Sequence, residues 1–473
     1  MIFSVLVASV LAIASAAPAK RDQGIVVPIR REGESATLGL TVARYQTAIK
    51  SGSPVSPLVN GGEGNYFFAD IQFGDSPTTS RVVFDTGSSD TWAIGSECTA
   101  DAKAGCSPNE TGSVKVDGSF KSLKAKGQTL YGDGSYGVDY NIYSTNVAYG
   151  GVTAKNLPVG IVTYDFGGVK IPGILGMGWN SISNVAKALK GANANFLDAT
   201  GYSTFGMYIN PSTSVDGEVS FGFYDSSMYS GDFQWFPVSS FTDPNGNNVA
   251  NGWWQFAANV LTFSQGTNSY DYGNDETSTP NGVSIADSGT PELLLTDAAA
   301  SAINQWFNPN YDPNSNTVPC KGKSLVLTFT APDGTVASYS IAYNLLVQEQ
   351  NGACQSLVTG GAEKLGFTIF GAPFYQAAYT AYDKTNNRIG FAQLKGSVPN
   401  PPIPSTTAVP PAPTTSTKAP RVSTTIAPKC NHDECSVGAF LHAGCSKCAD
   451  EVCAQDSYCC NNKWDDSCVN EVN

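Results

Sequence analysis

Histidine is almost absent from this sequence of 473 residues. The chain has two, His432 and His442, and both lie near its C-terminal end, so the long body before them contains no imidazole. This absence excludes catalysis by a Ser/His or Cys/His pair and metal binding by histidine throughout the body. If the body is an enzyme, its acid–base groups are expected to be carboxylates.

Charge and long apolar segments are also scarce. Charged residues make up 14% of the chain, against about 25% in an average domain. The 27 basic and 40 acidic residues leave a net charge of −13, which argues against nucleic acid as a partner. After residue 16 no apolar run reaches the roughly 18 residues of a membrane span, and the C-terminal residues form no hydrophobic tail. The sequence therefore predicts no membrane span and no lipid anchor.

The residues that are abundant favour β-structure. The chain has 48 glycines and many Ser, Thr, Asn, Tyr and Val residues, and its apolar fraction of 41% is enough for a large core. At about 150 residues per domain, the length allows about three folded units.

The N-terminal region has the pattern of a processed precursor. Residues 2–14 are almost continuously apolar and Ala-Ser-Ala follows at 14–16, which predicts a signal peptide over 1–16 and a secreted, extracellular protein. The twelve cysteines agree with an oxidising compartment. Residues 17–60 carry six basic and three acidic groups before an acidic body. They are interpreted as a pro-segment that low pH releases, with a disordered linker as the alternative and Lys20-Arg21 as a candidate processing site.

The C-terminal region is expected to be a spacer followed by a small module. Residues 397–429 are rich in Pro, Ser and Thr and predict an extended linker. Residues 430–473 hold eight cysteines, which favour a disulfide-rich module whose pairing the sequence leaves open among 105 possibilities. Zinc bound by Cys445, Cys448 and the two histidines is the alternative. The module resembles those that many secreted microbial proteins carry after such linkers. Tyr458 and Trp464 could form a platform for carbohydrate or cell wall, or pack against the disulfides.

An internal repeat marks the body of the chain. Residues 82–89 and 283–290 share a hydrophobic approach followed by Asp, a small hydroxyl residue, Gly and another hydroxyl. Each has a distant companion, Gly-Ile-Leu-Gly at 173–176 and Thr-Ile-Phe-Gly at 368–371. Two similar lobes packed about a pseudo-twofold axis would bring the two aspartates face to face.

The paired aspartates, Asp85 and Asp287, suggest a specific chemistry. Two carboxyls that share a site cannot both ionise easily, so one keeps a proton while the other acts as a base. A water held between them can attack an amide carbonyl without a side-chain nucleophile or a metal. The neighbouring glycines and hydroxyls are predicted to support the carboxyls through backbone N–H groups and by fixing their orientation. The supporting residues are Thr86, Gly87, Ser88, Ser288, Gly289 and Thr290.

At these residues the chain resembles the pepsin-type aspartic peptidases. The resemblance extends over 61–396 and includes the runs 66–74 and 381–391. It implies an all-β, bilobal fold with an active-site cleft between an N-lobe over 61–238 and a C-lobe over 239–396. It also implies catalysis by Asp85 and Asp287, acid-active cleavage of protein or peptide substrates, inhibition by pepstatin-type compounds and no cofactor or metal. We expect a monomer.

The same resemblance assigns residues around the substrate. Tyr131, followed by Gly132 and Asp133, matches the tyrosine of the hairpin flap that closes over substrate, and Trp92 matches the tryptophan that hydrogen-bonds it. Buried β-sheet aromatics are the alternative interpretation of the two rings. Asp133 resembles an acid that accepts lysine just before the scissile bond, or is a solvated turn carboxylate.

Other positions agree with the family or depart from it. Ile171 and Ile174 match the apolar wall of the main specificity pocket, which implies a preference for hydrophobic residues. Pro291 and Glu292 replace a hydroxyl-bearing residue and its apolar neighbour, so a contact to the substrate backbone upstream of the cut is expected to be lost. Pro172 stands where an acid is common, and we expect little catalytic effect from it.

Covalent features complete the predicted body. Its cysteines are predicted to pair by lobe, Cys98 with Cys106 and Cys320 with Cys354. Asn109 begins an N-glycosylation sequon in a predicted surface loop.

Two other functions stay open at this stage. One is a pepsin-like fold that has lost activity and serves as a binding or inhibitor protein. The other makes the C-terminal module the main functional part and the body an accessory.

Overall fold

The computed structural model of the protein describes the greater part of the predicted body and little of its flanks. The described residues are 25–29, 66–76, 79–100, 106, 113–131, 136–167, 169, 171–211, 217–242, 248–249, 251–258, 260–272, 283–350, 352–396, 438–439 and 463–464. The predicted signal peptide, most of the pro-segment, the linker and most of the C-terminal module lie outside them.

The chain divides into two units, Met1–Pro404 and Ser405–Asn473. In the second unit, the described residues are an antiparallel pair of short strands, β28 (Gly438–Ala439) and β29 (Lys463–Trp464). The fold and the site described below belong to the first unit.

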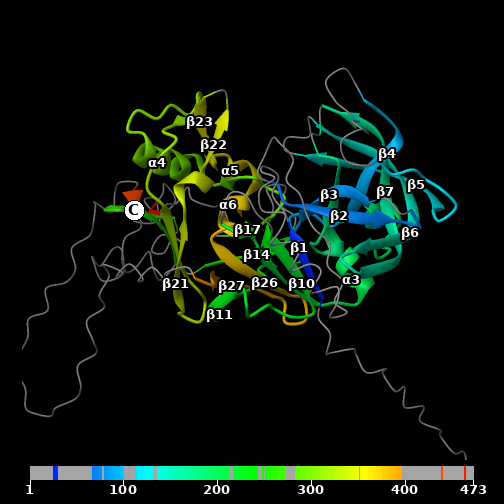
Figure 1. The fold of residues 1–473 in the computed structure, drawn as a ribbon. Coiled ribbons are helices and arrows are strands. Elements are labelled where there is room, and N and C mark those ends of the chain that lie inside the picture. The colour runs from blue at the N-terminus through cyan, green and yellow to red at the C-terminus, as the bar shows by residue number, and fades with distance from the viewer. Residues whose placement is uncertain are drawn as a thin grey trace, which may run out of the picture. The chain divides into compact units, whose positions relative to one another are not determined.

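The N-terminal lobe is one large mixed sheet (Figure 1). Its strand order is β2-β3-β8-β4-β7-β6-β5. In the hairpin strand β5, intermediate and exposed positions alternate along most of its length, as expected for a strand with one face toward the solvent. Strands near the centre are more fully buried, and all four residues of β8 are buried. The strand bounds are β2 Phe68–Phe73, β3 Thr79–Asp85, β4 Thr91–Ala100, β5 Lys121–Tyr131, β6 Tyr136–Tyr149, β7 Val152–Phe166 and β8 Gly173–Gly176.

The C-terminal lobe is built from smaller sheets. One runs β14-β17-β25-β18-β24, a second β16-β15-β20-β21 and a third β19-β23-β22, beside the short pair β12 and β13. The strand bounds are β12 Phe241–Thr242, β13 Asn248–Val249, β14 Gln255–Phe256, β15 Val260–Gln265, β16 Asn268–Asp271, β17 Ser284–Ala286, β18 Leu293–Leu294, β19 Thr317–Val318, β20 Leu325–Thr330, β21 Val336–Ile341, β22 Val347–Gln350, β23 Ala353–Ser356, β24 Val358–Thr359 and β25 Thr368–Phe370.

The sequence repeat corresponds to a structural repeat. In the N-terminal lobe β3 pairs in parallel with its companion strand β8, which pairs antiparallel with β4. In the C-terminal lobe β17 pairs in parallel with β25, which pairs antiparallel with β18. Each aspartate therefore stands where a parallel strand pair ends, and the same arrangement occurs in both lobes.

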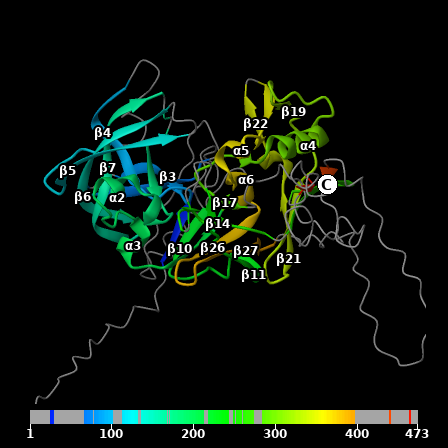
Figure 2. The same cartoon turned by 180° about the vertical axis from the view of Figure 1, so that it is seen from behind.

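A separate six-stranded sheet joins the lobes, and the sequence did not indicate it. Its order is β1-β10-β9-β26-β27-β11, so strands from distant parts of the chain pair side by side. In both ribbon views β10, β26 and β27 lie below and between the two lobes (Figures 1 and 2). The strand bounds are β1 Ile25–Ile29, β9 Thr204–Tyr208, β10 Gly217–Phe221, β11 Tyr229–Pro237, β26 Ala378–Asp383 and β27 Arg388–Leu394.

The helices are short and lie between strands. The longest that is described, α4, begins after Thr296, whose hydroxyl accepts the Ala299 N–H at 3.2 Å as an N-cap. Within the described residues no helix has the length and apolar character needed to cross a membrane. The helix bounds are α2 Asn184–Ala188, α3 Phe196–Thr200, α4 Asp297–Phe307, α5 Ala362–Leu365 and α6 Ala372–Tyr375, with 3₁₀ turns η1 Asn180–Ile182 and η2 Tyr343–Leu345.

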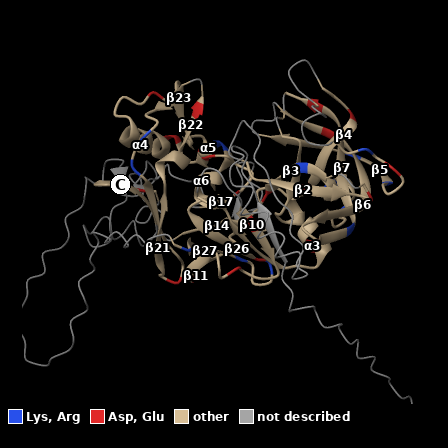
Figure 3. Ribbon diagram, in the orientation of Figure 1, with Lys and Arg blue, Asp and Glu red and all other residues tan. Residues whose placement is uncertain are grey.

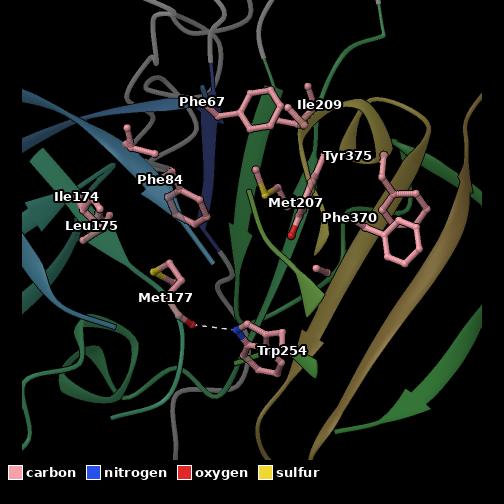
Figure 4. Packing of buried hydrophobic residues seen from close by; sticks show 14 of the residues in the cluster. Phe67, Phe84, Ile174, Leu175, Met177, Met207, Ile209, Trp254, Phe370 and Tyr375 are labelled. Carbon is pink, nitrogen blue, oxygen red and sulfur yellow. Dashed lines mark hydrogen bonds between the residues drawn. The ribbon is translucent and has the colours of Figure 1, made fainter. Parts of the chain in front are cut away.

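The buried core continues from one lobe to the other. Figure 4 shows Phe84 on the N-terminal side facing Met207 and Tyr375, and the Trp254 indole N–H donating to the Met177 carbonyl at 3.0 Å. Burying each large apolar side chain contributes about 1.5–3 kcal/mol. Lys, Arg, Asp and Glu are sparse over the described ribbon, as the composition requires (Figure 3). The predicted all-β, bilobal fold is confirmed.

Candidate active site

The two motif aspartates lie at matching places in the repeat. Asp85 is the last residue of β3 and is only 6% exposed. Asp287 follows β17, and its backbone N–H donates to the Phe370 carbonyl at 3.1 Å. In the N-terminal lobe the bond runs the other way, since the Asp85 carbonyl accepts the Met177 N–H at 2.7 Å. The backbone of each aspartate is therefore held by its companion segment, at Phe370 inside the segment in one lobe and at Met177 directly after it in the other.

The Asp85 carboxyl is held by its own loop. Oδ1 accepts the Gly87 N–H at 2.7 Å, and Oδ2 accepts the Ser88 hydroxyl at 2.5 Å. Both donors come from the motif itself, so the turn that follows the strand positions the carboxyl. This was the role predicted for these two residues.

The Asp287 carboxyl has the same two kinds of partner. Oδ1 accepts the Gly289 N–H at 2.7 Å, and Oδ2 accepts the Thr290 hydroxyl at 2.7 Å. Glycine is also required for a second reason. A Cβ atom at Gly289 would overlap the Asp85 carboxyl, and one at Gly87 would overlap the Asp287 carboxyl. The carboxyl of each lobe thus packs directly against the motif glycine of the other.

The remaining hydroxyls of the motifs connect the lobes instead of contacting the carboxyls. Thr86 Oγ1 accepts the Ser288 N–H at 2.9 Å and donates to the Ala286 carbonyl at 3.0 Å. Ser288 Oγ accepts the Thr86 N–H at 3.0 Å and donates to the Phe84 carbonyl at 2.7 Å. The Tyr375 hydroxyl, which was not among the predicted site residues, lies 2.8 Å from Thr86 Oγ1. None of these hydrogen bonds of Thr86 and Ser288 reaches a carboxyl, in contrast to the orienting role expected for the two hydroxyls.

Burial and proximity change the acidity of the pair. Burial raises the pKa of Asp85 well above its usual range, and the neighbouring Asp287 carboxyl adds to this rise. Hydrogen bonds from Ser88 and from the Gly87 N–H favour the ionised form and oppose the rise. The pair can therefore retain one proton under conditions in which an isolated aspartate is ionised.

Aromatic residues surround the carboxyls. Tyr131 ends β5, its ring centroid lies 6.5 Å from that of Trp92, and it stacks on Tyr136 at 5.8 Å. Among the described residues the Tyr131 hydroxyl has no hydrogen-bond partner with normal geometry. Burial and Asp85 raise the pKa of Tyr131, and the Trp92 indole is close enough to oppose this rise. The flap residues Gly132 and Asp133 lie outside the described residues.

Tyr66 is a neighbour of the pair that sequence reasoning did not select. Burial raises the pKa of Tyr66 to about 12, and the charges of Tyr136, Glu292, Asp287 and Asp85 add to this rise. All these groups therefore lie within electrostatic range of one hydroxyl. The residue was inside the run 66–74 that carried the family resemblance, but nothing local marked it as a site residue.

The predicted specificity residues differ in exposure. Ile174 is only 3% exposed, because it pairs within the central sheet, whereas Ile171 is partly exposed. Pro291 and Glu292 are also partly exposed. Both predicted disulfides, Cys98–Cys106 and Cys320–Cys354, are present. The sequon asparagine Asn109 lies outside the described residues.

Comparison with known proteins agrees with this geometry. The family model described as eukaryotic aspartyl protease matches residues 66–394, and a model described as a domain of unknown function (DUF8252) matches 428–473. Cathepsin E-A of Xenopus laevis is 24% identical, over 82% of this chain and 94% of its own length. Rhizopuspepsin-3 of Rhizopus niveus is 28% identical, over 67% and 76%. Vacuolar protease A of Arthroderma otae is 27% identical, over 74% and 84%. The chain thus belongs to the eukaryotic aspartyl protease family and is a pepsin-like aspartic endopeptidase.

Proposed function

We propose that Asp85 and Asp287 are the catalytic pair and that they hydrolyse peptide bonds at acidic pH. One observation carries this proposal: the carboxyls of buried Asp85 and half-buried Asp287, from opposite lobes, pack against each other's motif glycines while each keeps its own N–H and hydroxyl donors. The arrangement is symmetric, so one proton can be shared between them. The intact pair also argues against a pepsin-like protein that only binds its partners.

The reaction follows from the shared proton. A water between the carboxyls gives a proton to the ionised carboxylate as its oxygen bonds to the peptide carbonyl carbon. The protonated carboxyl donates a hydrogen bond to the carbonyl oxygen, where negative charge develops. Proton transfer to the amide nitrogen then lets the carbon–nitrogen bond break. No covalent enzyme intermediate is required.

Hydrophobic residues beside the scissile bond are the proposed preference. The partly exposed side chains of Tyr66, Tyr131 and Ile171 and the exposed ring of Tyr136 supply apolar surface. Asp133, in the flap, would accept a lysine immediately before the bond through a salt bridge.

The protein is proposed to be a secreted zymogen. Strand β1, which lies in the predicted pro-segment, pairs antiparallel with β10 from Ile25 opposite Phe221 to Ile29 opposite Gly217. The segment therefore belongs to the sheet that joins the lobes. A cut at Lys20-Arg21 alone would leave β1 attached, so we expect activation to include a second cut between β1 and the start of the protease region at Tyr66.

The C-terminal module is proposed to hold the enzyme on carbohydrate or cell wall. Its cysteine content and position after a Pro/Ser/Thr-rich linker support an independent unit. Removing residues 397–473 should abolish retention on wall polysaccharide and leave peptide cleavage intact. Loss of cleavage in the truncated protein would contradict a purely targeting role.

The catalytic proposal is tested by cleavage of a denatured protein between pH 2 and 8. The enzyme should be secreted from a eukaryotic host and assayed after removal of the pro-segment, with and without pepstatin. We expect acid activity that pepstatin abolishes and that is lost in Asp287→Asn. An active Asp287→Asn variant would refute the proposed pair, and an inactive wild type would favour a binding protein.

A further inference from the structure

A buried asparagine lies beside the loop that follows Asp85, and the proposed reaction does not use it. Asn195 is fully buried and stands directly before helix α3, where its Oδ1 accepts the Asp198 N–H at 3.1 Å as an N-cap. The cap needs only the side-chain oxygen. The amide nitrogen plays no part in it, so this half of the side chain has a different role.

The amide nitrogen of Asn195 holds two segments of the chain together. Its Nδ2 donates to the Ser89 hydroxyl at 3.2 Å and to the Gly178 carbonyl at 2.9 Å. Ser89 belongs to the loop after Asp85, and Gly178 belongs to the segment directly after β8. One buried amide group therefore connects the two segments that meet at Asp85.

The same two segments contact Asp85 directly. The Met177 N–H donates to the Asp85 carbonyl at 2.7 Å. The Gly178 N–H donates to the Ser88 carbonyl, also at 2.7 Å, and the Ser88 hydroxyl donates to the Asp85 carboxyl at 2.5 Å. A displacement of Ser89 or Gly178 would therefore move Ser88 and change the orientation of the carboxyl that it holds.

Lys384 determines which end of the Asn195 amide faces the loop. Its ammonium donates to Asn195 Oδ1 at 3.3 Å and to Asp198 Oδ1 at 2.6 Å. The ammonium and the Asp198 N–H can only donate, and the Gly178 carbonyl can only accept. Rotating the amide by half a turn would set its NH2 group against two donors and its oxygen against a carbonyl. The amide therefore has one favourable orientation, with its donors toward the loop.

Lys384 comes from the sheet that joins the lobes. It lies in the turn between β26 and β27, and its backbone N–H donates to the Ser203 carbonyl at 2.8 Å. The Lys384 side chain is 8% exposed, and its ammonium lies 4.9 Å from the centroid of the Trp179 ring. Burial lowers the pKa of Lys384, and the Asp198 carboxylate opposes this shift. The ammonium is thus held in place by packing and by an ion pair.

We infer that Asn195, oriented by Lys384, is a positioning residue for catalysis, whose amide nitrogen holds the loop after Asp85 in the geometry that the reaction needs. Asn195 is fully buried, so it cannot contact substrate and acts through the two segments that it connects. Misplacing a catalytic group by about 1 Å can cost about a hundredfold in rate. Loss of the amide nitrogen should therefore lower kcat and leave KM nearly unchanged. This role presupposes that Asp85 and Asp287 are the catalytic pair proposed above.

Two substitutions remove the amide nitrogen and keep a good N-cap residue. Asn195→Asp is isosteric, and the adjacent ammonium favours the ionised form of the new carboxyl, which would present an acceptor to the Gly178 carbonyl. Asn195→Ser has a shorter side chain with no second donor. Thr296→Ala is the matched control, because it removes the N-cap of α4 in the other lobe. Both kcat and KM are measured on one peptide, with active sites counted by pepstatin titration and stability measured by urea unfolding.

Both asparagine variants should lower kcat per titrated site by about tenfold to 100-fold and leave KM nearly unchanged. Thr296→Ala should lower stability without lowering kcat. An asparagine variant with the kcat of the wild type, or one whose only loss is a raised KM, overturns the inference. An equal loss of kcat in Thr296→Ala would assign the effect to stability and also counts against it. A wild type that cleaves nothing would refute the catalytic pair instead.

The orienting role of Lys384 is tested by Lys384→Met and Lys384→Arg in the same assay. The methionine variant removes the ammonium and should lower kcat by about threefold to tenfold, the equivalent of about one hydrogen bond. The arginine variant keeps the charge and the donors and should stay closer to the wild type. A methionine variant with the kcat of the wild type, or an arginine variant as impaired as the methionine variant, overturns the role of Lys384.

Discussion

Removing the Thr86 hydroxyl should uncouple the lobes at the active site. Thr86 is fully buried, and its Oγ1 contacts the Ser288 N–H, the Ala286 carbonyl and the Tyr375 hydroxyl at 2.9, 3.0 and 2.8 Å. Thr86→Val keeps the side-chain volume but leaves the buried Ser288 N–H without its partner. A buried donor without a partner costs about 1–3 kcal/mol. Because the contacts of the other two groups are also weakened, we expect the free energy of unfolding to fall by about 2–4 kcal/mol.

Thr86→Ser is the matched control, because it keeps the hydroxyl and reproduces the residue of the second motif. It removes one methyl group and should cost about 1 kcal/mol. Urea unfolding between pH 4 and 5, followed by tryptophan fluorescence, gives both free energies of unfolding. We also expect Thr86→Val to lower kcat more than Thr86→Ser does. If the valine variant is as stable as the serine variant, the cross-lobe hydrogen bonds do not stabilise the site and the reasoning is wrong.

Three further predictions concern pH, a disulfide and the flap. Burial raises the pKa values of Asp85 and Asp90, so above about pH 4 the native state binds more protons than the unfolded state. The free energy of unfolding should therefore fall as the pH rises from about 4 toward these raised pKa values. The exposed carboxyls of Asp117 and Asp333 have lowered pKa values and act in the opposite direction, but solvent screens their effect. A thermal midpoint that climbs steadily from pH 3 to 7 would contradict this. Replacing Cys320 and Cys354 with serine should cost about 3–4 kcal/mol in urea unfolding, and a loss below about 1 kcal/mol would argue against loop closure as the cause. Tyr131→Phe should change the free energy of unfolding by no more than about 0.5 kcal/mol, because the hydroxyl lacks a partner with normal geometry among the described residues. The same variant should lower kcat/KM about tenfold. An unchanged kcat/KM would show that the hydroxyl has no part in the function of the flap.

Local motifs made the repeat and its companions predictable. Residues 82–89 and 283–290 carry the same pattern of Asp, hydroxyl and Gly, and their companions pair with the aspartate strands as β8 and β25. Glycines mark these places because the chains approach too closely for a side chain. Such constraints are visible in a sequence, since only one residue type satisfies them.

The sheet between the lobes has no comparable signal. In it Met207 of β9 pairs with Thr380 of β26, although the two residues are far apart in the chain. Strand pairing of this kind depends on which apolar faces become buried together, and no single residue type is required at either position. The role of Tyr66 was hidden for the same reason, because its neighbours come from the other lobe and from the flap strands.

The central claim, that Asp85 and Asp287 act as one catalytic unit, is tested most directly by the activities of Asp85→Asn, Asp287→Asn and the double variant. All three should be measured on one peptide at the pH of maximal activity, with folding checked by tryptophan fluorescence. If the carboxyls share a proton and a water, each single variant should lose at least about a thousandfold in kcat, and the double variant should be no worse than either. Losses that multiply in the double variant, or appreciable activity in either single variant, would contradict the account.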